Sequence, residues 1–151
     1  MDNFTIRFVK QGDLIPLIDL CEAHAEYEKA SFDKFGKAEK LGQYLFGDTP
    51  ALYCLVVEKD HQLIGYATYI KQFSTWDASF YIYMDCLFMN DTSRGMGLGE
   101  KLVDKIKEEA KKLGCDLIQW QTPDFNTRAI KFYKRIGAVS KPKERFFLTV
   151  E

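Results

Sequence analysis

The stretch that decides the fold is "NDTSRGMGLGEKL", Asn90–Leu102, which holds three glycines within five residues. It lies between an aromatic-rich apolar run and a segment with helical periodicity. Glycines at alternate positions expose backbone N–H groups and permit turns that a side chain would forbid. Because a helix is predicted to begin within these glycines and Arg94 precedes them, we expect the turn to bind an anion, with phosphate as the natural candidate.

Length and composition limit the class of protein. A chain of 151 residues, 46% of them hydrophobic, can bury a core as one domain covering residues 1–151. Its 21 basic and 22 acidic residues nearly cancel, which leaves no overall field to attract nucleic acid or a membrane surface. We therefore expect a small-molecule ligand, no nucleic acid and no membrane partner.

Cysteine usage and the N-terminus bear on metals and location. The four cysteines are far apart and form no C-x-x-C pair, and the chain has two histidines, so no metal site is expected. The first ten residues, "MDNFTIRFVK", lack the apolar segment of a signal peptide, and no apolar run approaches the ~18 residues of a spanning helix. These features predict a cytoplasmic protein with reduced thiols. Cys86 is interpreted as a small apolar filler, with a nucleophilic thiol as the minor alternative.

Hydrophobic periodicity predicts strands that alternate with helices. Strands are predicted at residues 4–8, 52–58, 62–72, 79–89, 116–122 and 145–150. Helices are predicted at residues 11–30, 37–47, 98–114 and 126–137. Asp13 and Asn126 are the expected N-caps, Gly114 and Gly137 the expected stops, and His61 a turn residue. The order mixes hairpins with two crossovers, which predicts an α/β fold with a central mixed, twisted sheet and helices on both faces.

Two familiar phosphate-binding motifs do not fit the glycine turn. A P-loop needs G-x-x-x-x-G-K-[ST], but Glu100 stands five residues after Gly95 and no Lys-Ser or Lys-Thr follows. A dinucleotide fingerprint needs G-x-G-x-x-G, but after Gly95 and Gly97 the third glycine is Gly99 and not residue 100. Without its context, the cluster is equally well explained as a tight strand-to-helix turn with no ligand.

The context is more specific. "RGMGLG", residues 94–99, follows a long strand at the start of a helix and resembles the R/Q-x-x-G-x-G/A pyrophosphate loop of the GCN5-related N-acetyltransferase (GNAT) family. "NTRAIKFYKRIGA", residues 126–138, is similar to that family's N-x-x-A-x-x-x-Y-x-x-x-G helix. Two motifs in the expected order are a stronger signal than either alone. The resemblance covers nearly the whole chain, most specifically residues 81–138, and implies the GNAT fold.

The resemblance implies acetyl-CoA as the cofactor and assigns residues to its parts. The pyrophosphate is expected on the backbone of Arg94, Gly95, Met96, Gly97, Leu98, Gly99 and Glu100. In this family the strand before the loop separates from its neighbour, and its backbone, here Leu87, Phe88 and Met89, pairs with the pantetheine amides. The resemblance also places on the cofactor Asn126, Ala129, Phe132, Tyr133 and Arg135. Tyr133 would be the general acid that protonates the departing thiolate.

The acceptor chemistry calls for carboxylates. If the acceptor is an amine with a pKa near ~10.4, its deprotonation at pH 7 costs about 4 to 5 kcal/mol, so the site should supply a base, a water path or desolvation. Catalytic candidates are Asp85 in the long strand and Glu28 at the end of the first helix. Taken singly, each is more typical of a solvated surface charge. The predicted acceptor site comprises Tyr27, Glu28, Trp76, Asp77 and Asp85.

Within the GNAT family, the chain resembles the diamine, polyamine and thialysine acetyltransferase branch. The resemblance is carried by "EYE", "YMDCLFM", "RGMGLG" and "FYKRIGA". Those enzymes tend to carry a Glu-Asp pair late in the long strand, whereas Met84 and Asp85 here keep only the Asp. This departure favours smaller amines or amino-acid side chains over spermidine or spermine.

The predicted activity is therefore transfer of an acetyl group from acetyl-CoA to a primary amine of a small molecule by direct attack. Two alternatives are a non-catalytic acyl-CoA-binding regulatory module and an enzyme that acetylates a protein N-terminus or lysine. The family resemblance also favours a homodimer. The aromatic segment "RFFLTV", residues 145–150, suits either its interface or a core strand.

Overall fold

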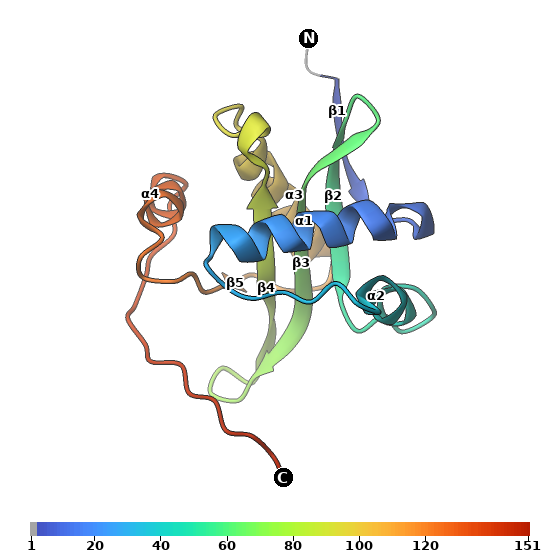
Figure 1. Ribbon diagram of the computed structural model, residues 1–151. Coiled ribbons are helices and arrows are strands. Elements are labelled where there is room, and N and C mark those ends of the chain that lie inside the picture. The colour runs from blue at the N-terminus through green and yellow to red at the C-terminus, as the bar shows by residue number, and fades with distance from the viewer. Residues whose placement is uncertain (1–2) are drawn as a thin grey trace. The chain divides into compact units, whose positions relative to one another are not determined.

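The computed structural model describes residues 3–151, and its strands form a five-stranded mixed sheet in the order β1-β2-β3-β4-β5 (Figure 1). The strands are β1 (Phe4–Phe8), β2 (Tyr53–Lys59), β3 (Gln62–Ser74), β4 (Ser79–Met89) and β5 (Ile118–Gln119). The first four pair antiparallel, and β5 pairs with β4 in parallel. That parallel pair needs a crossover, which helix α3 (Leu98–Lys112) supplies.

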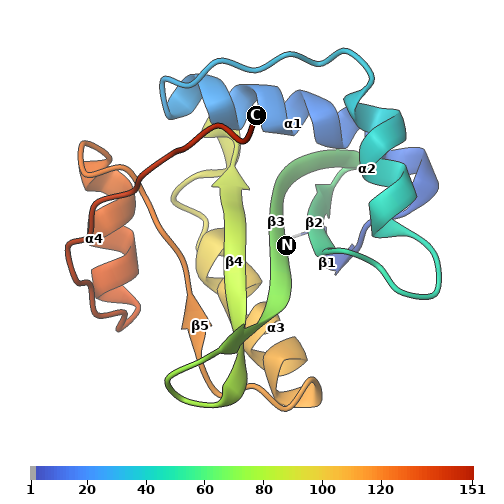
Figure 2. The ribbon, with the colours of Figure 1, turned by 90° about the horizontal axis from the view of Figure 1, so that it is seen from below.

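Helices cover both faces of the sheet, as predicted. On one face lie α1 (Leu14–Tyr27), which follows a 3-10 turn η1 (Gln11–Asp13), and α2 (Lys37–Leu45); α3 lies on the other face (Figure 2). The core under α3 includes Leu98, Leu102 and Ile106, which have exposed fractions of 2% or less. The core under α1 includes Leu17, Val56, Tyr66 and Phe88. Strand β4 lies between the two cores, so it can place side chains toward α1 on one face of the sheet.

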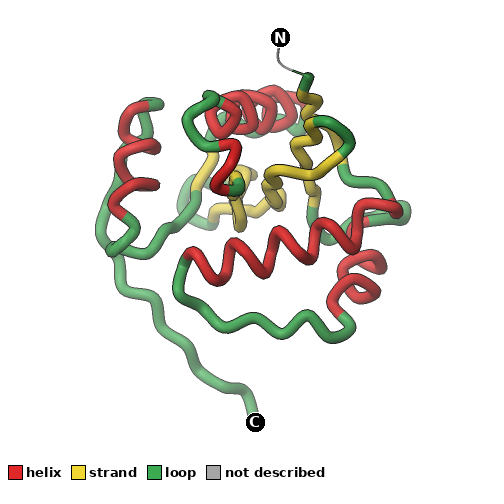
Figure 3. The backbone as a smooth tube through the Cα atoms, turned by 45° about the horizontal axis from the view of Figure 1, so that its top comes forward, coloured by secondary structure: helices red, strands yellow, loops and turns green. Residues whose placement is uncertain are grey.

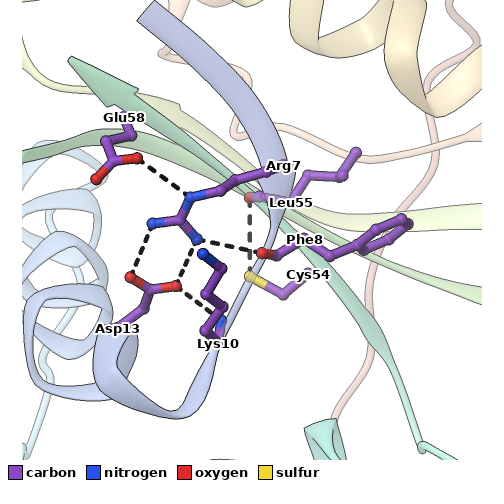
Figure 4. Close-up of polar contacts among 7 residues, drawn as sticks. All are labelled: Arg7, Phe8, Lys10, Asp13, Cys54, Leu55 and Glu58. Carbon is purple, nitrogen blue, oxygen red and sulfur yellow. Dashed lines mark hydrogen bonds and ion pairs between the residues drawn. The ribbon is translucent and has the colours of Figure 1, made fainter. Parts of the chain in front are cut away.

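Asp13 is the N-cap of α1, as predicted, although its side chain makes no cap hydrogen bond to the helix. Its carboxylate instead accepts hydrogen bonds from Arg7 Nη1 at 2.7 Å, Arg7 Nη2 at 3.1 Å and the Lys10 backbone N–H at 2.7 Å (Figure 4). The guanidinium from β1 offers two charge-assisted bonds, which are stronger than a bond from a helix N–H.

The described chain divides between Gln121 and Thr122 into two compact units. The second unit contains α4 (Thr127–Arg135), where Asn126 is the N-cap as predicted: its side chain accepts a hydrogen bond from the Ala129 N–H at 3.4 Å. Gly137 follows the helix with a φ of 99°, which a residue with a side chain rarely adopts. The prediction of one domain over residues 1–151 stays a prediction.

Two strand predictions need correction. The strand predicted at residues 116–122 is confined to Ile118–Gln119, and residues 145–150 form no strand within the described part of the chain (Figure 3). Phe146, Leu148 and Val150 are between 86% and 94% exposed. Their β-favouring residue types cannot form a strand alone, because a strand needs a neighbour to pair its backbone groups. Because residues 145–150 form no strand, the second predicted crossover, through the helix at residues 126–137, is also absent from the described sheet.

The other predicted elements are confirmed within a few residues at each end. Residues 79–89 form β4, Gly97 precedes α3, Gly114 ends it with a φ of 75°, and His61 lies in the β2–β3 turn. Among the described residues, no helix combines the length and the apolar character that crossing a membrane requires.

Candidate active site

The loop after β4 is held by its own polar side chains. The Asn90 backbone N–H donates to the Ile64 carbonyl at 2.9 Å, which ties the loop to β3. Ser93, 3% exposed, donates through its hydroxyl to the Asn90 carbonyl at 2.9 Å and to Asn90 Oδ1 at 2.8 Å. Thr92 Oγ1 adds a bond to the same oxygen at 3.1 Å. These bonds hold the turn η2 (Asp91–Ser93) in one conformation, which fixes the position of the glycines that follow it.

Two glycines of the loop need the left-handed conformation. Gly95 has a φ of 86° and Gly97, the N-cap of α3, a φ of 75°. A Cβ built on either would meet nothing within 4 Å, so packing inside the protein does not explain the bare backbone. No side chain caps α3, which leaves its first N–H groups and the positive end of its dipole available to an anion. The loop thus fits a diphosphate.

The edge of β4 that faces β5 is open beyond its first residues. The two strands pair only at Ile82 with Ile118 and at Tyr83 with Gln119. Residues 84–89 have no strand partner on that edge among the described residues of this unit. Leu87, Phe88 and Met89, predicted to pair through their backbone with a ligand, all lie on this unpaired length. A ligand with amide groups can add to such an edge.

A β-bulge redirects the side chains of β4. Thr68 pairs with Cys86 and Tyr69 with Met84, so Asp85 has no opposite residue on β3. Before the bulge, Ile82 and Met84 face the core under α3; after it, Cys86 and Phe88 face the core under α1. Asp85 and Cys86 therefore share the α1 face, and Cys86 Sγ lies 3.8 Å from Asp85 Oδ2.

A chain of polar contacts connects the two predicted catalytic carboxylates. Cys86, next to Asp85, hydrogen-bonds with Tyr66, and the Tyr66 hydroxyl lies 2.7 Å from His24 Nδ1. His24 Nε2 lies 2.9 Å from Glu28 Oε2. This series of contacts runs from β4 across β3 to the last turn of α1. Glu28 and Asp85, which are 57 positions apart in the sequence, therefore lie at its two ends on the α1 face.

Burial makes the thiols of this region poor nucleophiles. It raises the pKa of the Cys86 thiol to about 11, with the neighbouring Asp85 carboxylate adding to the shift, and it raises the pKa of the Cys21 thiol too. At pH 7 both sulfurs keep their protons. Since the thiolate is the reactive form, this supports the interpretation of Cys86 as a filler side chain.

Arg94 connects the loop to the end of α1. Its guanidinium lies 4.4 Å from the centre of the Tyr27 ring and 5.6 Å from that of Phe88, and it pairs with Asp91. The predicted cofactor-loop residue and the predicted acceptor-site residue Tyr27 are thus in contact. The arginine predicted as a mobile charge beside the glycines is 17% exposed and held over two rings.

Trp76 and Asp77 are not brought to this region. They lie in the turn between β3 and β4, and Ser79 and Phe88 are separated by roughly 30 Å of extended strand. Trp76 is 98% exposed. Their assignment to the acceptor site stays a prediction.

Three residues that the fold places here, His24, Tyr66 and Lys59, were not predicted from the sequence. His24 lies four residues before Glu28 on one helix, a spacing that could have revealed the pair. Tyr66 carries no such signal, because only sheet register brings it beneath α1. Lys59 ends β2 with its Nζ 4.0 Å from Met96 Sδ, which places a cation beside the glycine loop; this contact also depends on tertiary structure.

In the second unit, α4 presents the predicted cofactor residues with helical spacing. Asn126 and Tyr133 are seven residues apart, close to two turns and about 10 Å along the axis, so both can contact one extended ligand. Arg135 and Phe132 are also near one another, with the guanidinium carbon 5.5 Å from the ring centre. The roles of Asn126, Ala129, Phe132, Tyr133 and Arg135 stay predictions.

The sequence matches known proteins along most of its length. The model of the acetyltransferase (GNAT) family matches residues 17–138. The chain belongs to the GNAT family. This GNAT chain is 34% identical over 141 residues to a thialysine N-epsilon-acetyltransferase of Bos taurus, covering 88% of this chain and 82% of the relative. An L-ornithine N5-acetyltransferase of Arabidopsis thaliana is 29% identical over 79 residues, 52% of this chain and 35% of that one.

Solved structures agree with the fold. An aminoglycoside N-acetyltransferase in complex with CoA superposes with a TM-score of 0.78 at 18% identity, covering 99% of this chain and 96% of the other. The GNAT fold, the resemblance to the thialysine and polyamine branch and the enzyme class, an acyl-CoA-dependent N-acetyltransferase, are thereby confirmed.

Proposed function

We propose that this GNAT enzyme acetylates the terminal primary amine of a small diamine or diamino acid, taking the acetyl group from acetyl-CoA by direct attack. The observation that carries the proposal is the place of Asp85 on β4: its carboxylate lies beside Cys86 on the α1 face of the sheet, where Glu28 ends α1. Two carboxylates on one small surface suit a compact cation. The names of the relatives, with thialysine and ornithine as acceptors, agree with a short amino-acid side chain.

The cofactor assignment follows from the loop and the open strand edge. Gly95 and Gly97 keep the backbone bare where α3 begins, which fits the pyrophosphate, and the β4 edge at Leu87, Phe88 and Met89, which has no strand partner among the described residues of this unit, can pair with the pantetheine amides. Lys59, beside Met96, adds a positive charge within reach of the loop. Acetyl-CoA, when bound, supplies an activated acetyl thioester.

The protein's own groups handle the protons. Asp85 and Glu28 hold the acceptor ammonium, and one of them takes its proton and passes it to solvent; the neutral amine, whose formation at pH 7 costs roughly 4 to 5 kcal/mol, then attacks the thioester. Tyr133 on α4 donates its phenolic proton to the departing sulfur. Tyr27, at the end of α1, fits as a wall of the acceptor site because Arg94 fixes its ring.

The proposal includes a homodimer in the cytoplasm. Support for the dimer comes from residues 145–150, where Phe146, Phe147 and Leu148 are at least 81% exposed. Such a row is the kind of surface that a second copy of the chain would bury. Light scattering of the intact protein and of a chain truncated after residue 144 would test this, with a monomeric intact protein as the contrary result.

The activity is tested by a screen of amines with acetyl-CoA that detects free thiol. Ornithine, lysine, thialysine and short diamines are expected to release thiol, with spermidine and spermine weaker by about tenfold or more, because the single acidic residue at this position of β4 offers less charge to a long polycation. Calorimetry with CoA forms the second arm. Binding without release for every amine would contradict the enzyme and favour a regulatory module.

Tyr133→Phe tests the general acid separately. The variant is expected to bind acetyl-CoA normally and to lose about 100-fold in kcat, the usual size of a general-acid contribution. Full turnover in the variant would remove Tyr133 from this role.

A further inference from the structure

His24 is fixed on every side in the α1 face of the sheet. Its ring stacks on Phe88 with centroids 5.0 Å apart at an interplanar angle of 19°, and meets Tyr66 edge-on at 5.7 Å. Its side chain is 13% exposed. Both nitrogens have partners: Tyr66 Oη at 2.7 Å and Glu28 Oε2 at 2.9 Å. These contacts hold the ring in one orientation, so its hydrogen bond with Tyr66 determines which ring nitrogen can donate to Glu28.

The partners determine which nitrogen carries the proton. Tyr66 is 2% exposed, and burial raises the pKa of its phenol, so the hydroxyl keeps its proton. A ring nitrogen is a stronger acceptor than the nearby thiol sulfurs, so Tyr66 donates to His24 Nδ1. Neutral His24 must then carry its proton on Nε2, which points at the Glu28 carboxylate.

Helix stability does not explain why Glu28 stands there. Glu28 is the C-cap of α1, and its backbone N–H donates to the His24 carbonyl at 3.0 Å. A carboxylate at a helix C-terminus is disfavoured by the dipole by about 0.3 to 1 kcal/mol. Its side chain is 32% exposed, against 13% for His24. The hydrogen bond to His24 holds the Glu28 carboxylate in a position that the helix dipole disfavours, and the carboxylate is partly open to solvent. This combination indicates a role toward a ligand.

We propose that His24 is a positioning residue: together with Tyr66 it aims the Glu28 carboxylate at the acceptor amine. The inference rests on the proposed role of Glu28 in acetyl transfer. It adds a residue that neither motif of the family contains, since His24 precedes both.

The proton position can be measured without any catalysis. The chain has two histidines, so histidine labelled with nitrogen-15 gives two ring systems in a two-bond proton–nitrogen correlation spectrum. His61→Gln, in the β2–β3 turn, assigns the remaining signals to His24. We expect the Nε2–H form for His24 and a mixture of forms in Tyr66→Phe. A predominant Nδ1–H form in the wild type would overturn the inference.

Two substitutions of His24 separate positioning from packing. In His24→Gln the side-chain amide can still donate to Glu28; in His24→Leu the side chain fills the space beside Phe88 and donates nothing. We expect His24→Gln to keep kcat/KM within about threefold and His24→Leu to lose about tenfold or more. Affinity for CoA should stay unchanged in both, and His61→Gln should keep the wild-type kcat/KM.

The outcomes distinguish this inference from the proposed function. If wild-type protein acetylates amines and both His24 variants keep its kcat/KM, the inference fails while the function stands. If no amine is acetylated, the function fails, and a His24 with its proton on Nδ1 would contradict the hydrogen-bond assignment as well. Circular dichroism and thermal melts confirm that each variant is folded before its kinetics are compared.

Discussion

The two ends of α1 each hold a carboxylate, and they hold it in opposite ways. At the N-terminal end, both oxygens of Asp13 are bound to the Arg7 guanidinium, and Arg7 Nε also contacts Glu58 at 3.2 Å (Figure 4). Arg7 lowers the pKa of Asp13, mainly through these hydrogen bonds. At the C-terminal end, Glu28 has a hydrogen bond to a single histidine and is 32% exposed, where the Asp13 side chain is 13% exposed.

The difference shows how structural and functional acids can be told apart. Asp13 sits where the helix dipole favours an anion and its charge is neutralised by a permanent cation. Glu28 sits where the dipole disfavours an anion, with a hydrogen bond to His24 and about a third of its side chain exposed. The first arrangement stabilises the fold, and the second leaves negative charge available for an acceptor amine.

The largest expected effect is on activity, from Glu28→Gln. Without the carboxylate, kcat/KM for the amine should fall about 100-fold, or about 2.7 kcal/mol, because the site loses its proton acceptor and a charge. The free energy of unfolding should change by less than about 0.5 kcal/mol, as for most surface substitutions. Initial rates of thiol release and urea titrations measure the two quantities. A fully active variant would leave Asp85 as the remaining candidate base.

Asp13→Asn should give the opposite result. The free energy of unfolding is expected to fall by about 2 kcal/mol, because the part-buried Arg7 loses one of its two carboxylate partners and keeps only Glu58. Activity of the folded protein should stay within about twofold of wild type, since the pair lies at the far end of α1 from Glu28. A loss of kcat/KM comparable to that of Glu28→Gln would contradict the division between the two ends.

Acid should erase the stability difference between wild type and Asp13→Asn. The pKa of Asp13 is lowered from 3.8 in the folded protein, so its stabilising contribution is complete above that value and is lost as pH falls through the folded pKa below 3.8. Unfolding free energies of the two proteins should therefore differ at pH 7 and converge by about pH 2. A constant difference across this range would show that the charge of Asp13 is not the cause.

The N-terminal end of α3 is a third helix end to compare with the two ends of α1, and it is proposed to bind the pyrophosphate. Gly97→Ala puts a side chain at a φ of 75°, which should cost about 1 kcal/mol of stability and weaken CoA binding by about tenfold. Gly36→Ala is the matched control, because Gly36 is the N-cap of α2 with a φ of 71° and equally open surroundings. Calorimetry should find normal CoA affinity in that control. Equal weakening in both would argue against the loop as the pyrophosphate site.

The smallest effect is expected from Cys86→Ala. The thiol, whose pKa is raised to about 11, lies in the polar chain but stays protonated at pH 7, so kcat/KM should remain within about threefold. Mass spectrometry after acetyl-CoA addition should detect no acetylated protein in the wild type. An acetyl group on Cys86 would instead support a covalent route.

Most of the fold and half of the site could be predicted from local patterns. The 3.6-residue period of α3, the boundaries of β4 and the caps at Asn126 and Gly114 depend on neighbours in sequence, so they were predicted within a few residues. Residues 145–150 have the composition of a strand, but whether they pair depends on what lies beside them, and the prediction of a strand was wrong within this chain.

By itself, the sequence determined the family, the glycine turn at the start of α3 and the residue types able to carry acetyl transfer, because motif spacing and periodicity are local properties of the chain. Only the tertiary structure decided that Cys86 and Phe88 turn toward α1, that Arg94 lies over Tyr27 and that Tyr66 reaches His24. These contacts depend on a one-residue bulge and on sheet register, which reverse the face of every later side chain and leave no trace in local composition.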